Sequence, residues 1–168
     1  MSYICHQCGK SHEGIPLSFA ADFPDQYANM SSEDRDIRST IASDQCIIDS
    51  ELFYVRGLLE IPVLDSDEVF LWGLWANVKE EVFDELDESW EEHGRETRHG
   101  PFKARLANKL AVYPDTLNLK MTVQIQPVGQ RPLFFIDEEA HPLAVAQRMG
   151  MSANETHELV SRLLHPNL

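Results

Sequence analysis

Two apolar segments in the middle of the chain constrain its fold most strongly. The segment CIIDSELFYVRGLLEIPVL (46–64) is dense in aliphatic and aromatic residues, and Asp49, Ser50 and Glu51 divide it into two strand-like runs. The segment VFLWGLWANV (69–78) follows after the polar connection DSDE, which has the length of a hairpin loop. Both segments are apolar at alternate positions and nearly apolar between them, as in strands covered on both faces. They therefore predict a central sheet.

Other periodic segments predict the elements around this sheet. LNLKMTVQIQP (117–127) alternates apolar and polar residues, and RPLFFID (131–137) is expected to pair with it. KEEVFDELDESWEEHG (79–94) has apolar residues three and four apart, so it predicts an amphipathic helix with a strongly acidic outer face. Further helices are predicted over 32–41, over 141–150 and after Ser152, which forms a capping-box pattern with Glu155.

The order of these elements indicates the fold class. Strands are clustered and helices are inserted among them, which favours an α+β fold with an antiparallel sheet and covering helices. A chain of 168 residues with 43% hydrophobic content fits a single domain, 1–168. Within it we distinguish an N-terminal segment (1–20) that the C-x-x-C pair of Cys5 and Cys8 makes zinc-knuckle-like, a sheet core with the inserted acidic helix (45–137) and a C-terminal helix pair (140–165).

The charge and the lengths of the apolar runs restrict the partners. The chain carries 14 Lys and Arg against 28 Asp and Glu, a net charge of -14, which repels phosphate backbones and anionic lipids at long range. The longest apolar runs are shorter than the roughly 20 residues that cross a bilayer, and no leader sequence opens the chain. We expect a cytoplasmic protein with no nucleic-acid or membrane partner, and the sequence leaves its oligomeric state open.

A cysteine and histidine motif near the start of the chain gives the clearest indication of a chemical function. Cys5 and Cys8 form a C-x-x-C pair, and Gly9 permits the tight turn that a metal knuckle needs. Tetrahedral zinc requires two more ligands, for which the candidates are His12 and the remaining thiol, Cys46. The sequence therefore predicts a structural Cys₃His zinc site.

Simpler interpretations of these cysteines remain open. Cys46 lies in an apolar run, and free cysteines are often small buried residues. A thioredoxin-like redox pair is the chemical rival, but that motif opens a helix, whereas GKSHEGIP is typical of a loop.

The C-terminal segment could be a DNA-binding motif or a pair of packed helices, and the scattered histidines could be functional or lie on the surface. The spacing of Ala146, Gly150 and Leu159 resembles a DNA-reading helix-turn-helix, but Glu155 and Glu158 would face phosphates with the wrong sign. Two packed helices are the better interpretation. His93, His99 and His165 are interpreted as surface residues.

A set of polar residues in apolar surroundings suggests a different function. Arg56 and Glu60 share one face of a strand, which predicts a structural ion pair. Alternatively, Arg56, Arg131 and His141 form an anion-binding pocket with Trp72 or Trp75 as an apolar wall. No Ser-His-Asp order, phosphate loop or H-E-x-x-H motif is present, so the sequence leans against an enzyme.

Several segments together resemble a bacterial family known only as domain of unknown function 2199. They are, in chain order, CHQCGKSH, SDQCIID, FYVRGLLEIPV, FLWGLW, YPDTLNLK, VGQRP and HPLA. The resemblance implies that the N-terminal cysteines and histidine and also Cys46 belong to the family pattern. The chain departs from that pattern at FKARL (102–106), where an aromatic, glycine-containing turn is expected, and at Ala146, where an acid is usual.

These observations lead to two functional hypotheses. The first is a non-enzymatic protein with structural zinc that binds another macromolecule, a basic protein partner, through its acidic surface, with an inhibitor or immunity-like role. The second is a small-molecule binder or enzyme that uses the pocket of Arg56, Arg131 and His141 for a carboxylate or phosphate.

Overall fold

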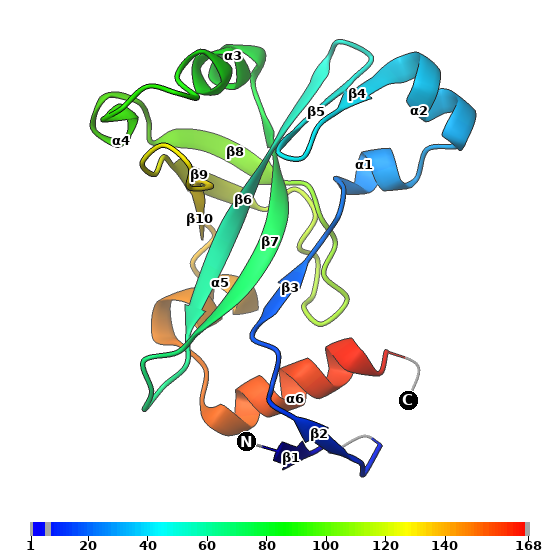
Figure 1. The fold of residues 1–168 in the computed structure, drawn as a ribbon, viewed down its shortest axis with the longest axis vertical. Helices are drawn as coiled ribbons and strands as arrows, with labels where there is room; N and C mark the ends of the chain where they lie inside the picture. Colours follow the sequence, from blue (N-terminus) through cyan, green and yellow to red (C-terminus); the bar gives the residue numbers. More distant parts are fainter. Residues whose placement is uncertain (1, 6–7, 167–168) are drawn as a thin grey trace.

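The computed structural model describes residues 2–5 and 8–166 (Figure 1). In chain order the elements are β1 (Ser2–Ile4), β2 (Ser11–Glu13), β3 (Ser18–Ala20), α1 (Asp25–Ala28), α2 (Ser32–Arg38), β4 (Ser39–Ile41), β5 (Gln45–Ile48), β6 (Leu52–Pro62), β7 (Val69–Val78), α3 (Glu80–Glu88), α4 (Arg95–Arg98), β8 (Phe102–Leu106), β9 (Lys120–Gln124), β10 (Leu133–Ile136), α5 (Pro142–Met149) and α6 (Ala153–Leu164). The molecule is thus α+β, as predicted.

A long antiparallel hairpin of β6 and β7 is the spine of the molecule (Figure 1). Its register runs from Phe53 opposite Val78 to Pro62 opposite Val69. The sheet order is β3-β7-β8-β9-β10-β6-β5-β4, and because β6 also pairs with β7, strands β6 to β10 form a closed ring. Most pairings are antiparallel, as predicted, but β3 pairs with β7 and β10 pairs with β6 in parallel.

The main core fills this ring of strands. Phe70, Leu59 and Phe134 are fully buried there among aliphatic side chains from all five strands. A Cβ atom at Gly57 would lie 2.3 Å from the Phe134 ring and 2.8 Å from the Pro132 carbonyl oxygen. Only glycine therefore lets β10 approach β6 closely enough to close the ring.

A second core cluster combines a side chain of α1 with side chains of β5, β6 and β7. It contains Tyr27, Cys46, Ile48, Tyr54, Trp75 and Ala107. The turn between β5 and β6 lies at the predicted place, and Asp49 and Ser50 both have positive φ, 54° and 53°. The strand predictions from the two central segments are therefore confirmed.

Three predicted elements differ from the structure. The helix predicted over 32–41 ends at Arg38, because residues 39–41 pair with β5 as β4. The segment FKARL, where the family resemblance implied a turn, is strand β8, which pairs with β7 and β9. The helix predicted over 79–94 ends at Glu88.

Arg95 explains the early end of the acidic helix. Its side chain is buried, and it donates hydrogen bonds to the carbonyl oxygens of Trp90, Gln126 and Gln130. These bonds tie the connection after α3 to the loop between β9 and β10. Arg95 then begins the separate short helix α4, after Gly94 with its φ of 82°.

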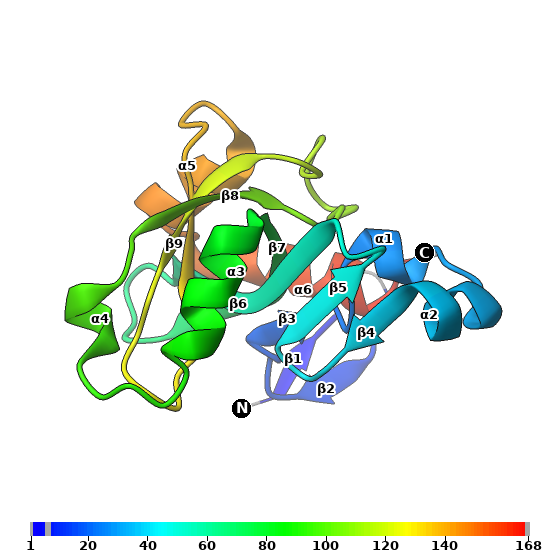
Figure 2. The ribbon, with the colours of Figure 1, turned by 90° about the horizontal axis from the view of Figure 1, so that it is seen from above.

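The two ends of the chain meet on one side of the ring of strands. Figure 1 shows the β1–β2 hairpin beside α6, with both termini in the lower part of the view, and Figure 2 shows the same elements from above. Helix α6 begins with the predicted capping box of Ser152 and Glu155. No helix in the described part of the chain combines the length and the apolar character of a membrane span.

Candidate metal centre

A tight turn after β1 brings the two N-terminal cysteines together. The Gly9 N–H donates to the Cys5 carbonyl oxygen and the Cys5 N–H donates to the Lys10 carbonyl oxygen, both at 2.9 Å. Gly9 has a φ of 67°, a conformation that other residues rarely adopt. Strand β2 then returns along β1 and places His12 beside the cysteines.

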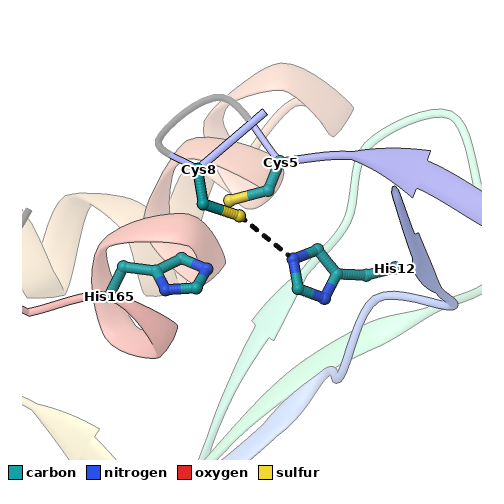
Figure 3. Close-up of side chains that lie close together, drawn as sticks. All are labelled: Cys5, Cys8, His12 and His165. Atoms are coloured by element: carbon teal, nitrogen blue, oxygen red, sulfur yellow. Dashed lines mark hydrogen bonds between the residues drawn. The ribbon is translucent and has the colours of Figure 1, made fainter. Parts of the chain in front are cut away.

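Four side chains converge at this turn. One ligand atom each from Cys5, Cys8, His12 and His165 lie within 4.8 Å of one another. Figure 3 shows the two sulfur atoms side by side, with the His12 and His165 rings on either side of them. The Cys8 Sγ lies 3.4 Å from the His12 Nε2, and the centroids of the two histidine rings are 5.8 Å apart.

The donor set and its spacing fit a zinc ion. Two thiolates and two imidazoles are a common structural zinc set, and ideal bond lengths put a sulfur and a nitrogen ligand roughly 3.6 Å apart. The observed distance of 3.4 Å from the Cys8 Sγ to the His12 Nε2 is close to that value. The His165 Nε2 is buried and has no hydrogen-bond partner among residues 2–5 and 8–166, a cost that a metal bond would remove.

Helix α6 supplies both a ligand and its surroundings. His165 directly follows the last helical residue, and Cys5 is fully buried with its Sγ 3.6 Å from the Ser161 Oγ. With a metal bound, the Cys5 thiolate can accept a hydrogen bond from the Ser161 hydroxyl. The candidate site therefore joins the N-terminal hairpin to the C-terminal helix.

Cys46 does not belong to this group. It lies on β5 opposite Tyr54, inside the second core cluster, and is fully buried. Burial raises the pKa of the Cys46 thiol to about 11, so it stays protonated at neutral pH and is a poor metal ligand. The prediction of Cys46 as a ligand is corrected here to its simpler interpretation, a small buried residue.

His165 takes the place that we had assigned to Cys46. Its ring is half-buried and faces the cysteines, which corrects its interpretation as a surface residue. No spacing rule links it to the cysteine pair, because β1 and α6 lie at opposite ends of the sequence. One indication of a further histidine ligand was present in the sequence: the motif supplies three ligands of the four that zinc needs, and several histidines of the chain had no assigned role.

The two arginines of the alternative site lie near Asp44. The Arg131 Nε donates to Asp44 Oδ1 at 2.6 Å. Arg56 donates to the carbonyl oxygens of Ser43 and Ala21 at 3.3 and 3.4 Å, and its buried Nε has no partner in the part of the chain that the structure describes. Glu60 is exposed and forms no ion pair among the described residues, so the predicted ion pair between Glu60 and Arg56 is wrong.

His141 and Trp72 lie in other surroundings. The His141 Nδ1 accepts a hydrogen bond from the Leu143 N–H at the start of α5, and its Nε2 contacts the Pro114 carbonyl oxygen. Trp72 is buried in the main core against Phe19 and Phe70. These contacts separate both residues from the surroundings of the two arginines.

Comparisons with known proteins give a family but no activity. A search of curated proteins and a search of solved structures each found no match. One family model, described as an uncharacterized protein conserved in bacteria, matches residues 4–151. This segment contains Cys5, Cys8 and His12 and ends before His165. Because the match covers most of the chain, the protein belongs to this bacterial family, DUF2199.

Proposed function

We propose that this protein is a zinc-stabilised binding protein rather than an enzyme. The convergence of two sulfur and two nitrogen donors within 4.8 Å carries this proposal. Four protein ligands complete a tetrahedral zinc shell and leave no position for water or substrate, which is the arrangement of structural zinc. The ion would hold the β1–β2 hairpin against the end of α6.

Metal analysis of untagged protein tests the zinc site. We expect one zinc per chain in the wild type and a clear loss in Cys8→Ser and in His165→Ala, because each removes one of four ligands. The matched control is Cys46→Ala, which removes a thiol outside the cluster. It should retain its zinc, while the free energy of unfolding falls by about 1–2 kcal/mol for the small cavity in the core.

Wild-type protein that holds no zinc, with all three thiols free, would contradict the proposal. Loss of zinc in Cys46→Ala, with retention in His165→Ala, would instead support the Cys₃His ligand set.

The binding role is proposed from the acidic surface around α3. Its exposed carboxylates are Glu80, Glu81, Asp84, Asp87, Glu88 and Glu91, and none of them is in an ion pair among the described residues. Trp90, directly after this helix, is 43% exposed and adds an apolar contact. Such a surface suits a basic protein partner, and a cytoplasmic inhibitor or immunity-like role would use it.

Two matched double variants test this surface. Asp84→Asn with Glu88→Gln removes two charges from one face of α3, and Glu33→Gln with Asp36→Asn removes two from α2, where both residues are exposed. From a bacterial lysate, the wild type and the α2 variant should retain the same basic protein, and the α3 variant should lose it. Equal retention by all three proteins would contradict a role for α3.

A further inference from the structure

A groove on the outer surface of the ring of strands has the opposite charge to the rest of the molecule. It has a volume of about 550 Å³ and lies where β7 passes into α3, beside β8 and β9. Four cationic side chains line it: Lys79 after β7, Lys103 and Arg105 on β8, and Lys120 on β9. Figure 2 shows β8 and β9 beside α3, the helix that begins directly after Lys79.

The positive charge of the groove contrasts with the net negative charge of the whole chain. Acids outnumber Lys and Arg by 28 to 14 in the whole chain, yet Asp137 is the one carboxylate among the described lining residues. Asp137 is engaged, because it accepts from the Lys103 Nζ at 3.1 Å and from the Thr122 hydroxyl at 2.8 Å. The groove therefore retains an excess of positive charge.

The strand register places two of these cations directly opposite each other. Arg105 pairs with Lys120 across β8 and β9, so both side chains leave the same face of the sheet. Like charges in this position destabilise a sheet. The ion pairs of the described residues give a carboxylate to Lys103 but none to Arg105, Lys120 or Lys79. Arg105 donates to the Asn118 carbonyl oxygen at 3.3 Å, but this neutral acceptor leaves the repulsion between the two cations uncompensated. Local features that cost stability in this way are expected at binding sites.

The start of α3 adds to the positive potential. Lys79 is the N-cap residue of this nine-residue helix and makes no side-chain capping hydrogen bond. The positive end of the helix dipole thus begins next to a groove-lining cation. Glu80 and Glu81 in the first turn weaken this effect, but neither belongs to the lining.

The size and lining of the groove indicate a small ligand. Its volume falls within the range of small-molecule sites, roughly 300–1,000 Å³. A long polyanion would extend beyond the groove over a protein with a net charge of -14, where it would be repelled. The described lining contains no aromatic side chain, so it offers no platform on which a nucleobase could stack.

We propose that this groove binds a small organic phosphate with two or more phosphate groups and without a nucleobase. Arg105 and Lys120 would share one phosphate, which would relieve their mutual repulsion, and Lys79 and Lys103 would reach another. This site is independent of the metal centre and uses none of its residues.

Calorimetric titration of the zinc-loaded full chain with fructose bisphosphate tests the proposal. We expect saturable binding of one ligand per chain that weakens as salt is added. Arg105→Gln and Lys120→Gln should each weaken binding about fivefold, because each removes one charge-assisted contact. Arg105→Lys and Lys120→Arg keep the charge and should retain most of the affinity. Unphosphorylated fructose should not bind.

The matched control is Arg148→Gln, an exposed cation on α5 outside the groove. It should bind like the wild type, and without ligand Lys120→Gln should melt no lower than the wild type. Absence of saturable binding would overturn the proposal, as would equal weakening by Arg148→Gln or no weakening by the groove variants. Tighter binding of ATP or of a short DNA duplex would overturn the assignment to a phosphate without a base.

Discussion

One histidine bridges two carboxylates on the acidic side of the molecule. The His99 Nδ1 lies 2.7 Å from Glu85 Oε1, and its Nε2 lies 2.5 Å from Glu92 Oε2. Hydrogen bonds to Glu85 and then to Glu92 raise the pKa of His99 above its usual value of 6.5, against a smaller opposing effect of desolvation. The His99 ring therefore joins α3 to the segment that leads into β8.

This bridge predicts a pH dependence of stability with a defined sign. Because the folded-state pKa of His99 is raised, its contribution is full below about pH 6.5 and is lost as the pH rises through the folded pKa. In urea unfolding, the wild type should therefore exceed His99→Gln in free energy of unfolding by more at pH 5.5 than at pH 8.5.

The same comparison made in a Glu85→Gln, Glu92→Gln background is the control. There the pH dependence of the His99→Gln effect should shrink, because the imidazolium has lost both partners. A difference between wild type and His99→Gln that grows with pH would have the wrong sign for this bridge.

At the level of elements, local sequence patterns correctly predicted those elements, turns and caps that depend on residues close in sequence. The hairpin of β6 and β7, the turn at Asp49 and Ser50 and the capping box of Ser152 follow from residues close in sequence. Strand β8 alternates apolar and charged residues, but it is only five residues long and its pairing partners β7 and β9 are distant in sequence, so the local pattern alone did not identify it.

The same limit explains the errors at the candidate metal centre. Cys5, Cys8 and His12 lie on one hairpin, so their spacing alone brought them together. His165 reaches them only because α6 packs beside that hairpin. Cys46 lies apart from them because its side chain on β5 is buried in the second core cluster. Neither fact is encoded in a local pattern. The close approach of β10 at Gly57 and the hydrogen bonds of Arg95 beyond the end of α3 are likewise tertiary effects.

At the scale of the whole molecule, a metal ion at the candidate site would link the two ends of the chain. The four candidate ligands come from the first hairpin and from the residue after α6, so nearly the entire chain lies between Cys5 and His165. The main core, by contrast, consists mainly of side chains from β6 to β10 and their covering helices. Metal binding should therefore hold the two ends together while contributing little to the ring of strands.

Hydrogen exchange before and after zinc chelation measures this division directly. We predict that chelation lowers protection of β1, β2 and the last turn of α6 together, while β6 to β10 keep theirs, because only the end segments depend on the shared ion. Cys46→Ala should show the same division. Loss of protection in the N-terminal hairpin with an unchanged α6 end would contradict His165 as a ligand, and loss throughout β6 to β10 would contradict a core that is independent of the metal.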